Sequence, residues 1–189
     1  MDRGLIVYLH GFCSSPASWK SQLLAEEMAR RGMAAKFVCP QLSPVPDEAV
    51  ASVSRLIEQA SGPVTLIGSS LGGHYANHLA EKHGLNAVLI NPAVSASLDL
   101  EKFVGDHANF HTGEQFTFTK AHAAQLLAQV AKPTPERYWL LVEEGDEVLD
   151  YRQALAFYAG CRQTVLPGGD HSFTKFPDFV PQIIEYAGL

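Results

Sequence analysis

The segment Gly68–Gly72, which reads Gly-Ser-Ser-Leu-Gly, constrains the fold of this chain more than any other feature. It follows the apolar run 64–67 and leads into residues 71–80, which carry a helical pattern. A serine between glycines, where a strand gives way to a helix, is typical of a nucleophile elbow. The glycines leave room for a very tight turn, and the serine at its apex takes a backbone conformation that is uncommon outside glycine. The pattern therefore predicts that Ser70 is exposed at the end of a strand, beside the positive end of a helix.

Two other interpretations of this segment compete with the first. Short glycine and serine patterns also arise by chance, so the match alone does not establish a nucleophile. Gly68 and Gly73 have the spacing of a phosphate-binding loop, which continues with Lys and then Ser or Thr. This chain has His74 and Tyr75 at those positions. Without the lysine there is no positive charge for the outer phosphates, so the phosphate-loop interpretation is strongly disfavoured.

Strand-like apolar runs alternate with helix-like segments along most of the chain. The runs expected to form strands are residues 5–9, 35–38, 64–67, 87–90, 138–142 and 163–166. The expected helices are one capped by Ser15 and ending at Gly32, one capped by Asp47, one from the elbow to Gly84, and three near 121–130, 151–159 and 176–186. Such alternation predicts a single α/β domain over 1–189, with about six mostly parallel strands and helices on both faces of the sheet.

The stretch from about 94 to 135 interrupts this alternation. It contains the polar and aromatic loop 107–113 and the helix expected near 121–130. A long excursion at the carboxyl side of a sheet often carries function. The stretch is either a small lid over the elbow or packing that only shields the sheet edge, and the sequence leaves both open.

Composition excludes several classes of protein. The chain has 189 residues, of which 47% are hydrophobic and 18% are charged, as expected for one soluble globular domain. The net charge of −6 argues against a nucleic-acid partner. No apolar run approaches the roughly 20 residues that span a bilayer, and the N-terminus enters a strand without a signal peptide, so we expect a cytoplasmic protein. Cys13, Cys39 and Cys161 are expected to be reduced thiols, with no disulfide, metal site or cofactor.

A histidine to activate the serine is expected late in the chain. A serine hydroxyl needs a base to take its proton, and after an elbow the acid and then the histidine follow, each in a loop after a strand. The loop 167–173 contains His171, which alone among the eight histidines lies in a glycine-rich loop beyond the last expected strand. We therefore expect His171 to act as general base and then as general acid.

The acid is expected in the loop 143–150. Asp146 is the first choice, because it follows Gly145 and because Val148 can anchor the loop in the core. Its carboxylate would fix the tautomer of the histidine and stabilise the imidazolium. Asp150 is the rival, although it can instead cap the next helix. The other acidic residues of the loop are expected to be solvated: Glu143, Glu144 and Glu147.

An oxyanion hole requires two N–H donors near the serine. The backbone of Leu71, directly after the nucleophile, is expected to supply one. The second is expected from Phe12, in the loop after the first strand, where Gly11 lets the backbone approach closely. Two histidines are assigned to substrate binding with Gly11: His10, which would orient this loop by hydrogen bonding, and His74, which would line the floor of the site.

Five segments of the chain carry a wider resemblance. They are Leu9–Phe12 with Ser14–Pro16, Gly68–Gly73, Asn91–Ala93, Gly145–Gln153 and Gly169–Phe173. Together and in this order they resemble the YqiA-like esterases, which are small bacterial α/β-hydrolases, over nearly the full length of the chain. The resemblance implies an α/β-hydrolase fold, an intracellular setting, no metal, and esterase activity on acyl esters or thioesters. It also implies that Ser70 is the nucleophile, Asp146 the acid and His171 the base. Cys13 departs from the family, in which a polar residue such as asparagine is expected.

The favoured hypothesis is a serine esterase that hydrolyses small-molecule carboxylic esters or thioesters through an acyl-enzyme. A chain of this length leaves little room for a large cap, so we expect a shallow site for short or flexible acyl groups. The apolar residues available to hold an acyl chain are Phe103, Phe110, Phe116 and Phe118. Two alternatives remain: a non-catalytic binding module with the same fold, since fold alone does not prove activity, and an acyltransferase that passes the acyl group to an alcohol or thiol.

Overall fold

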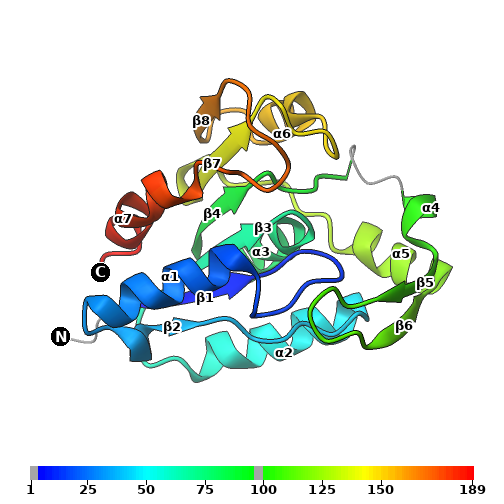
Figure 1. Ribbon diagram of the computed structural model, residues 1–189, viewed down its shortest axis with the longest axis horizontal. Coiled ribbons are helices and arrows are strands. Elements are labelled where there is room, and N and C mark those ends of the chain that lie inside the picture. Colours follow the sequence, from blue (N-terminus) through cyan, green and yellow to red (C-terminus); the bar gives the residue numbers. More distant parts are fainter. Residues whose placement is uncertain (1–3, 96–99) are drawn as a thin grey trace.

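The computed structural model describes residues 4–95 and 100–189, which form a central sheet with helices on both faces (Figure 1). Within these residues the sheet has six strands: β1 (Leu5–Leu9), β2 (Phe37–Val38), β3 (Val64–Ser69), β4 (Asn86–Ile90), β7 (Tyr138–Glu143) and β8 (Arg162–Leu166). Their order is β2-β1-β3-β4-β7-β8, and every adjacent pair is parallel. The predicted fold class is therefore confirmed. Strand β2 is shorter than expected because residues 34–36 form a turn of 3₁₀ helix.

The strand order determines where a site can form. The strands β1, β3, β4 and β7 are almost wholly buried, which explains why they are apolar along their length. All six strands run the same way, so the loops that follow them meet at one edge of the sheet. Strand β2, which follows β1 in the chain, lies on one side of β1, and β3 lies on its other side. The order in which the chain adds strands to the sheet therefore reverses between β1 and β3. Ligands of open α/β sheets bind in the crevice at such a point.

Two layers of helices cover the sheet. One face packs against α1 (Trp19–Arg30) and α7 (Phe176–Tyr186), with Leu24, Phe176 and Ile183 fully buried. The opposite face is covered by α2 (Pro46–Gln59), α3 (Leu71–His83), α5 (Lys120–Ala128) and α6 (Tyr151–Phe157). No helix in the described parts of the chain has the length and apolar character needed to cross a membrane.

Two helices are capped differently from the sequence prediction. Ser15 does not cap α1, which begins four residues later, and its hydroxyl instead accepts a hydrogen bond from the N–H of Ala17 in a turn before the helix. Asp47 does not cap α2, because Pro46 already occupies the first helical position. Proline favours that position because its φ is preset and it has no N–H to satisfy, so the helix starts two residues earlier than predicted.

The interrupting stretch 94–135 contains a hairpin that the sequence analysis did not predict. Residues 96–99 lie outside the described part of the chain. The elements that follow are α4 (Leu100–Phe103), β5 (Gly105–Ala108), β6 (Gln115–Phe118) and α5. Strands β5 and β6 pair with each other in antiparallel fashion as a separate sheet, and we call them the β5–β6 hairpin.

The tip of the β5–β6 hairpin is hydrogen-bonded to the loop after β1. The N–H of Phe110 donates to the carbonyl of Cys13 over 2.8 Å. The side-chain amide of Asn109 donates to the carbonyl of Ser14, also over 2.8 Å. Figure 1 shows the hairpin beside this loop, away from the edge formed by β8. The hairpin therefore borders the crevice at the carboxyl ends of the strands.

Candidate active site

Ser70 occupies a tight turn between β3 and α3, with φ 55° and ψ −122°. Residues other than glycine rarely adopt this conformation, and packing around the turn enforces it. A Cβ atom on Gly72 would overlap the carbonyl oxygen of Leu9 in β1. A Cβ atom on Gly73 would lie only 2.5 Å from the side chain of Pro92. The elbow thus depends on backbone surfaces that touch where no side chain could fit.

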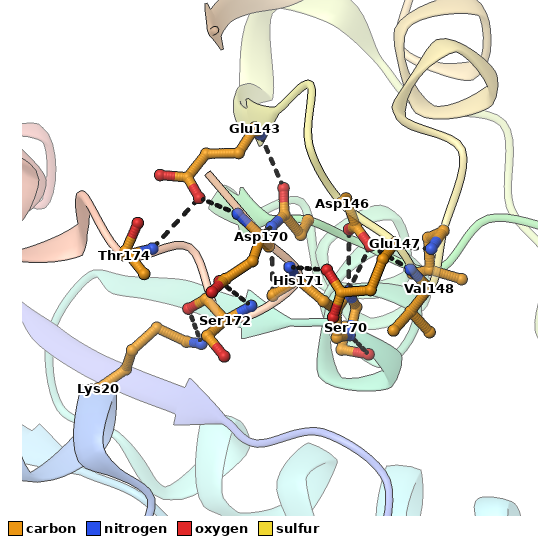
Figure 2. Close-up of polar contacts among 12 residues, drawn as sticks. Lys20, Ser70, Glu143, Asp146, Glu147, Val148, Asp170, His171, Ser172 and Thr174 are labelled. Carbon is orange, nitrogen blue, oxygen red and sulfur yellow. Dashed lines mark hydrogen bonds and ion pairs between the residues drawn. The ribbon is translucent and has the colours of Figure 1, made fainter. Parts of the chain in front are cut away.

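Three residues from distant parts of the chain meet beside this turn (Figure 2). The Nε2 atom of His171 lies 3.0 Å from Oγ of Ser70. Its Nδ1 atom lies 2.9 Å and 2.8 Å from the two carboxylate oxygens of Asp146. The Asp146 side chain is only 2% exposed, whereas that of His171 is 22% exposed. Because a carboxylate can only accept, Nδ1 carries the proton and Nε2 is left to accept one from Ser70.

The Asp146 carboxylate has further partners that fix its orientation. Its Oδ1 atom accepts hydrogen bonds from the N–H groups of Val148 and Leu149, each over 2.9 Å. The expectation that Val148 anchors this loop in the core is wrong, because Val148 is 62% exposed and Leu149 packs against the core instead. The rival residue Asp150 caps α6 by accepting from the N–H of Arg152.

The two residues expected to form an oxyanion hole lie next to Ser70. Leu71 is the first residue of α3, so its N–H has no acceptor within the helix. Gly11 lies against Ser70 so closely that a Cβ atom on Gly11 would be 3.3 Å from that of the serine. Phe12 follows Gly11, and its ring makes edge-on contacts with aromatic rings of the 94–135 stretch: Phe103, His107, Phe116 and Phe118.

The two histidines expected to contribute to substrate binding lie in different places. His10 is buried, its Nδ1–H donates to the carbonyl of Gly11, and its Nε2 accepts from the N–H of Leu42. Burial lowers the pKa of His10, so the neutral ring that makes these two bonds is favoured. His74 is buried within α3, and this burial is the main reason that its pKa falls to about 4. Its Nε2 atom has no hydrogen-bond partner among the described residues. His74 does not line the cavity described next, whereas His10 does.

A cavity of about 290 Å³ adjoins the elbow. It is lined by residues 10–14, 41–44, Leu71, Tyr75, Asn109, Glu114 and Phe116. Of the phenylalanines expected to hold an acyl chain, Phe116 lines this cavity, Phe118 is fully buried and Phe110 is 79% exposed. The described residues contain no cluster of His, Cys, Asp or Glu arranged to hold a metal ion. The cavity thus extends from Phe12 and Leu71 beside the elbow to the β5–β6 hairpin.

Side chains from other elements hold the segment that carries His171. We call residues 167–175, between β8 and α7, the His171 loop. The amide of Asn91 donates to the carbonyls of Asp170 and His171 over 3.0 Å and 3.2 Å. The buried Lys20 donates from Nζ to the carbonyl of Ser172 over 2.7 Å, and burial lowers its pKa to about 8. The sequence analysis missed both residues, although a polar residue directly after a buried strand, as Asn91 is, was a usable signal.

The prediction of a solvated acidic loop is wrong for Glu143. This residue is the last of β7 and is 0% exposed, because the strand extends one residue beyond the predicted end and the His171 loop covers it. Glu144 and Glu147 are exposed as expected, and Glu147 also accepts a hydrogen bond from the N–H of His171 over 3.0 Å. Figure 2 shows the Glu143 carboxylate beside the His171 loop.

Known proteins share this arrangement of elements. A family model described as an uncharacterised protein family, UPF0227, matches residues 5–188. Alpha/beta hydrolase domain-containing protein 10 from mouse is 18% identical, with 97% of this chain and 89% of that chain covered at a TM-score of 0.71. Est1E from Butyrivibrio proteoclasticus is 12% identical, with 98% of this chain and 88% of that chain covered at a TM-score of 0.72. A monoacylglycerol lipase from Paleococcus ferrophilus is 16% identical, with 98% and 94% covered at 0.70. These likenesses show that the chain has the α/β-hydrolase fold.

Proposed function

The chain belongs to the uncharacterised protein family UPF0227, as its motifs led us to expect, and we propose that it is a serine esterase. Its substrates would be small carboxylic esters, with oxygen or sulfur as the leaving atom. The observation that carries the proposal is the continuous path from Ser70 Oγ through the His171 ring to Asp146, with contacts of 3.0 Å and 2.8 Å. Hydroxyl, imidazole and carboxylate in this connection are what an activated serine nucleophile requires.

In the proposed reaction Ser70 attacks the carbonyl carbon of the ester. Its hydroxyl proton moves to Nε2 of His171 as the new C–O bond forms, and the carbonyl oxygen becomes an oxyanion. The Asp146 carboxylate stabilises the imidazolium without taking its proton. The imidazolium then protonates the leaving alcohol or thiol, which departs and leaves the acyl group on Ser70. Water then attacks the carbonyl carbon of the acyl-enzyme while His171 Nε2 takes its proton. The imidazolium returns this proton to Ser70 Oγ as the acyl C–O bond breaks, which releases the carboxylic acid and restores the serine.

Backbone donors near the serine would stabilise the charge that develops on the oxyanion. The N–H of Leu71 stands at the N-terminal end of α3, where the helix dipole also favours negative charge. The N–H of Phe12 is the second proposed donor, supported by the close approach of Gly11 to Ser70. Each such donor typically contributes about 3 kcal/mol to the transition state.

The cavity beside the elbow suggests the size of substrate. Its volume of about 290 Å³ lies at the small end of the range for ligand pockets. The apolar residues Leu71, Tyr75 and Phe116 can hold a short acyl chain on one side. We therefore propose short or flexible acyl groups as substrates, with the 94–135 stretch acting as a small lid on this space.

A fluorophosphonate probe and a chromogenic ester together test the proposal. We expect the probe to add once per chain in the wild type and in Ser69→Ala, and not at all in Ser70→Ala, as measured by intact mass. Ser69 is the matched control, because it is the neighbouring hydroxyl but belongs to the end of β3. We expect hydrolysis of p-nitrophenyl butyrate to fall to a small residual rate in Ser70→Ala and in His171→Ala.

Each contrary result has a defined meaning. Labelling of Ser70→Ala at another residue would refute the nucleophile. Equal residual hydrolysis in the wild type and both variants would favour a non-catalytic module. Ester or thioester products formed from an added alcohol or thiol, in place of the free acid, would identify an acyltransferase.

A further inference from the structure

Glu143 places a carboxylate under the segment that carries His171. Its Oε2 atom accepts hydrogen bonds from the N–H groups of Asp170, over 2.9 Å, and Thr174, over 3.2 Å. Its Oε1 atom accepts from the N–H of Lys175 over 3.1 Å. A Cβ atom on Gly169 would overlap the same carboxylate, so the loop also touches Glu143 closely. One side chain thus binds the His171 loop on both sides of the histidine.

These bonds replace the regular structure that the His171 loop lacks. The loop lies between β8 and α7, and three of its residues, Gly168, Gly169 and Phe173, have positive φ. Its backbone N–H groups therefore cannot all pair as in a helix or a sheet, and buried N–H groups need an acceptor. An ionised carboxylate forms stronger hydrogen bonds with such donors than a neutral group does. The Glu143 carboxylate is therefore matched to its three donors in both geometry and charge.

Glu143 does not belong to the chain of contacts that leads to Ser70. Among the described residues, the carboxylate on the His171 ring is that of Asp146, and the hydrogen-bond partners of the Glu143 carboxylate are all backbone N–H groups. Two other side chains bind the backbone carbonyls of the His171 loop, because Asn91 and Lys20 donate hydrogen bonds to them. Donors on the carbonyls and an acceptor on the N–H groups together fix the path of the loop.

We propose that Glu143 is a positioning residue that sets the place of the His171 ring over Ser70 by holding the His171 loop through its backbone. The proposal rests on the proposed esterase function, but its physical content is the connection between one buried carboxylate and one loop. A shift of about 1 Å in a reacting group can cost roughly a hundredfold in rate, so a loop that loses its acceptor should lower kcat.

The test compares Glu143→Gln with Glu144→Gln, its exposed neighbour, on p-nitrophenyl butyrate. Glutamine keeps the shape, but its NH₂ group would face backbone N–H donors that need an acceptor. We expect kcat to fall about 30-fold in Glu143→Gln, with KM within about threefold of the wild type. We expect Glu144→Gln to keep kcat within about twofold. Glu143→Asp keeps the charge, and its kcat should lie between those of the wild type and Glu143→Gln.

A second background separates positioning from general damage. In His171→Ala the ring is absent, so Glu143→Gln should change the residual rate by less than about twofold. The amide hydrogens of Asp170, Thr174 and Lys175 should exchange at least about tenfold faster in Glu143→Gln, while those of Val148 and Leu149 keep their wild-type rates.

Three results would overturn the proposal: unchanged kcat in folded Glu143→Gln, an equal loss of rate in the His171→Ala background, or unchanged exchange at the three amides. If Glu143→Gln does not fold, Glu143→Asp is measured in the same ways. Faster exchange at the three amides with full kcat, or a lowered kcat with wild-type exchange, would then reject the proposal. Wild-type protein without Ser70-dependent hydrolysis would reject the esterase function instead, and amide exchange would then still decide the role of Glu143.

Discussion

The Ser70 elbow and the His171 loop supply the two side chains of the proposed proton transfer, yet they are held in place by opposite means. The elbow is held by missing side chains, because Gly72 lies against the backbone of β1 and no Cβ atom fits there. The His171 loop is held by added side chains, because Glu143 and Asn91 reach its backbone from the ends of other strands. Steric contact therefore fixes the position of Ser70, and hydrogen bonds fix the position of His171.

This difference predicts different failures. A close-packed turn has no room to relax, so an added atom in the elbow should lower the free energy of unfolding of the whole domain. A hydrogen-bonded surface loop can lose one partner and keep the others. Changes around the His171 loop should therefore lower activity while the fold persists.

The largest effect on activity is expected for Asp146→Asn. The amide can present its NH₂ group to Nδ1 and favour the wrong tautomer of His171, so kcat should fall by about 10,000-fold, as a comparable change does in serine proteases. The melting temperature should change little, because asparagine has the same shape and its oxygen can still accept from the N–H groups of Val148 and Leu149. Hydrolysis of p-nitrophenyl butyrate measures kcat, and thermal unfolding measures the melting temperature.

The matched control for this change is Asp150→Asn. Asp150 caps α6, whereas among the described residues the His171 ring is hydrogen-bonded to Asp146 and Ser70. Asparagine also caps helices well, so kcat should stay within about twofold of the wild type. Equal losses in the two variants would mean that the acid has been assigned to the wrong residue.

How much of the site could be predicted follows the same division. The elbow and its serine were predictable because glycine spacing and strand-to-helix order lie in one short segment. His171 and Asp146 were predictable from their loops, and in the structure the His171 ring contacts both Ser70 and the Asp146 carboxylate. Glu143 was not, because its partners are backbone N–H groups 27 to 32 residues away, and such groups leave no pattern in the sequence.

The fold was predictable to a similar degree. Each strand of the main sheet was expected, and the four central strands were the clearest, because buried parallel strands are apolar along their whole length. The β5–β6 hairpin was missed, because Gly105–Ala108 carries a charge and shows no regular alternation of apolar and polar residues. Its stability comes from contacts with the loop after β1 and from the aromatic rings around Phe12, which are visible only in three dimensions.

Gly72→Ala tests the steric side. Its methyl group would overlap the Leu9 carbonyl, so we expect a loss of about 3 kcal/mol in the free energy of unfolding, measured by urea titration. Gly11→Ala is the matched control, because its Cβ atom would meet Ser70 at 3.3 Å, where a small shift suffices. That control should lose less than about 1 kcal/mol of stability. A stable Gly72→Ala protein with wild-type unfolding would contradict a sterically fixed elbow.

The free energy of unfolding should depend on pH through His74, in the helix α3 that follows the elbow. Burial lowers the pKa of His74 from 6.5 to about 4, so the unfolded chain binds the proton before the folded one as the pH falls. This contribution to stability is complete above pH 6.5 and is lost as the pH falls towards 4. Between pH 7.5 and pH 5 we expect a loss of about 2 kcal/mol that is absent in His74→Gln. Urea titrations at the two pH values measure it, with His111→Gln, an exposed histidine, as the control. A wild-type slope in His74→Gln would contradict this origin.

The smallest effect on catalysis is expected for Asn109, whose side chain joins the β5–β6 hairpin to the loop after β1. Asn109 donates to the carbonyl of Ser14 and lines the cavity, and its Oδ1 accepts from the N–H groups of His111 and Thr112. Asn109→Asp keeps this acceptor and removes only the donor, so it should loosen one wall without touching the proposed proton path. Loss of one such hydrogen bond is worth about 1 kcal/mol, which corresponds to a rise of about fivefold in KM with kcat within about twofold.

Thr117→Ala separates this contact from the hairpin itself. The Thr117 hydroxyl donates to Asp106 within the β5–β6 hairpin, so its loss removes an exposed hydrogen bond of the hairpin without freeing the hairpin from the loop after β1. We expect its KM to match that of the wild type. An equal rise in both variants would show that stability of the hairpin, and not its attachment to the loop, controls the cavity. Unchanged KM in both would mean that the hairpin, unlike the elbow and the His171 loop, does not need fixed placement for the reaction.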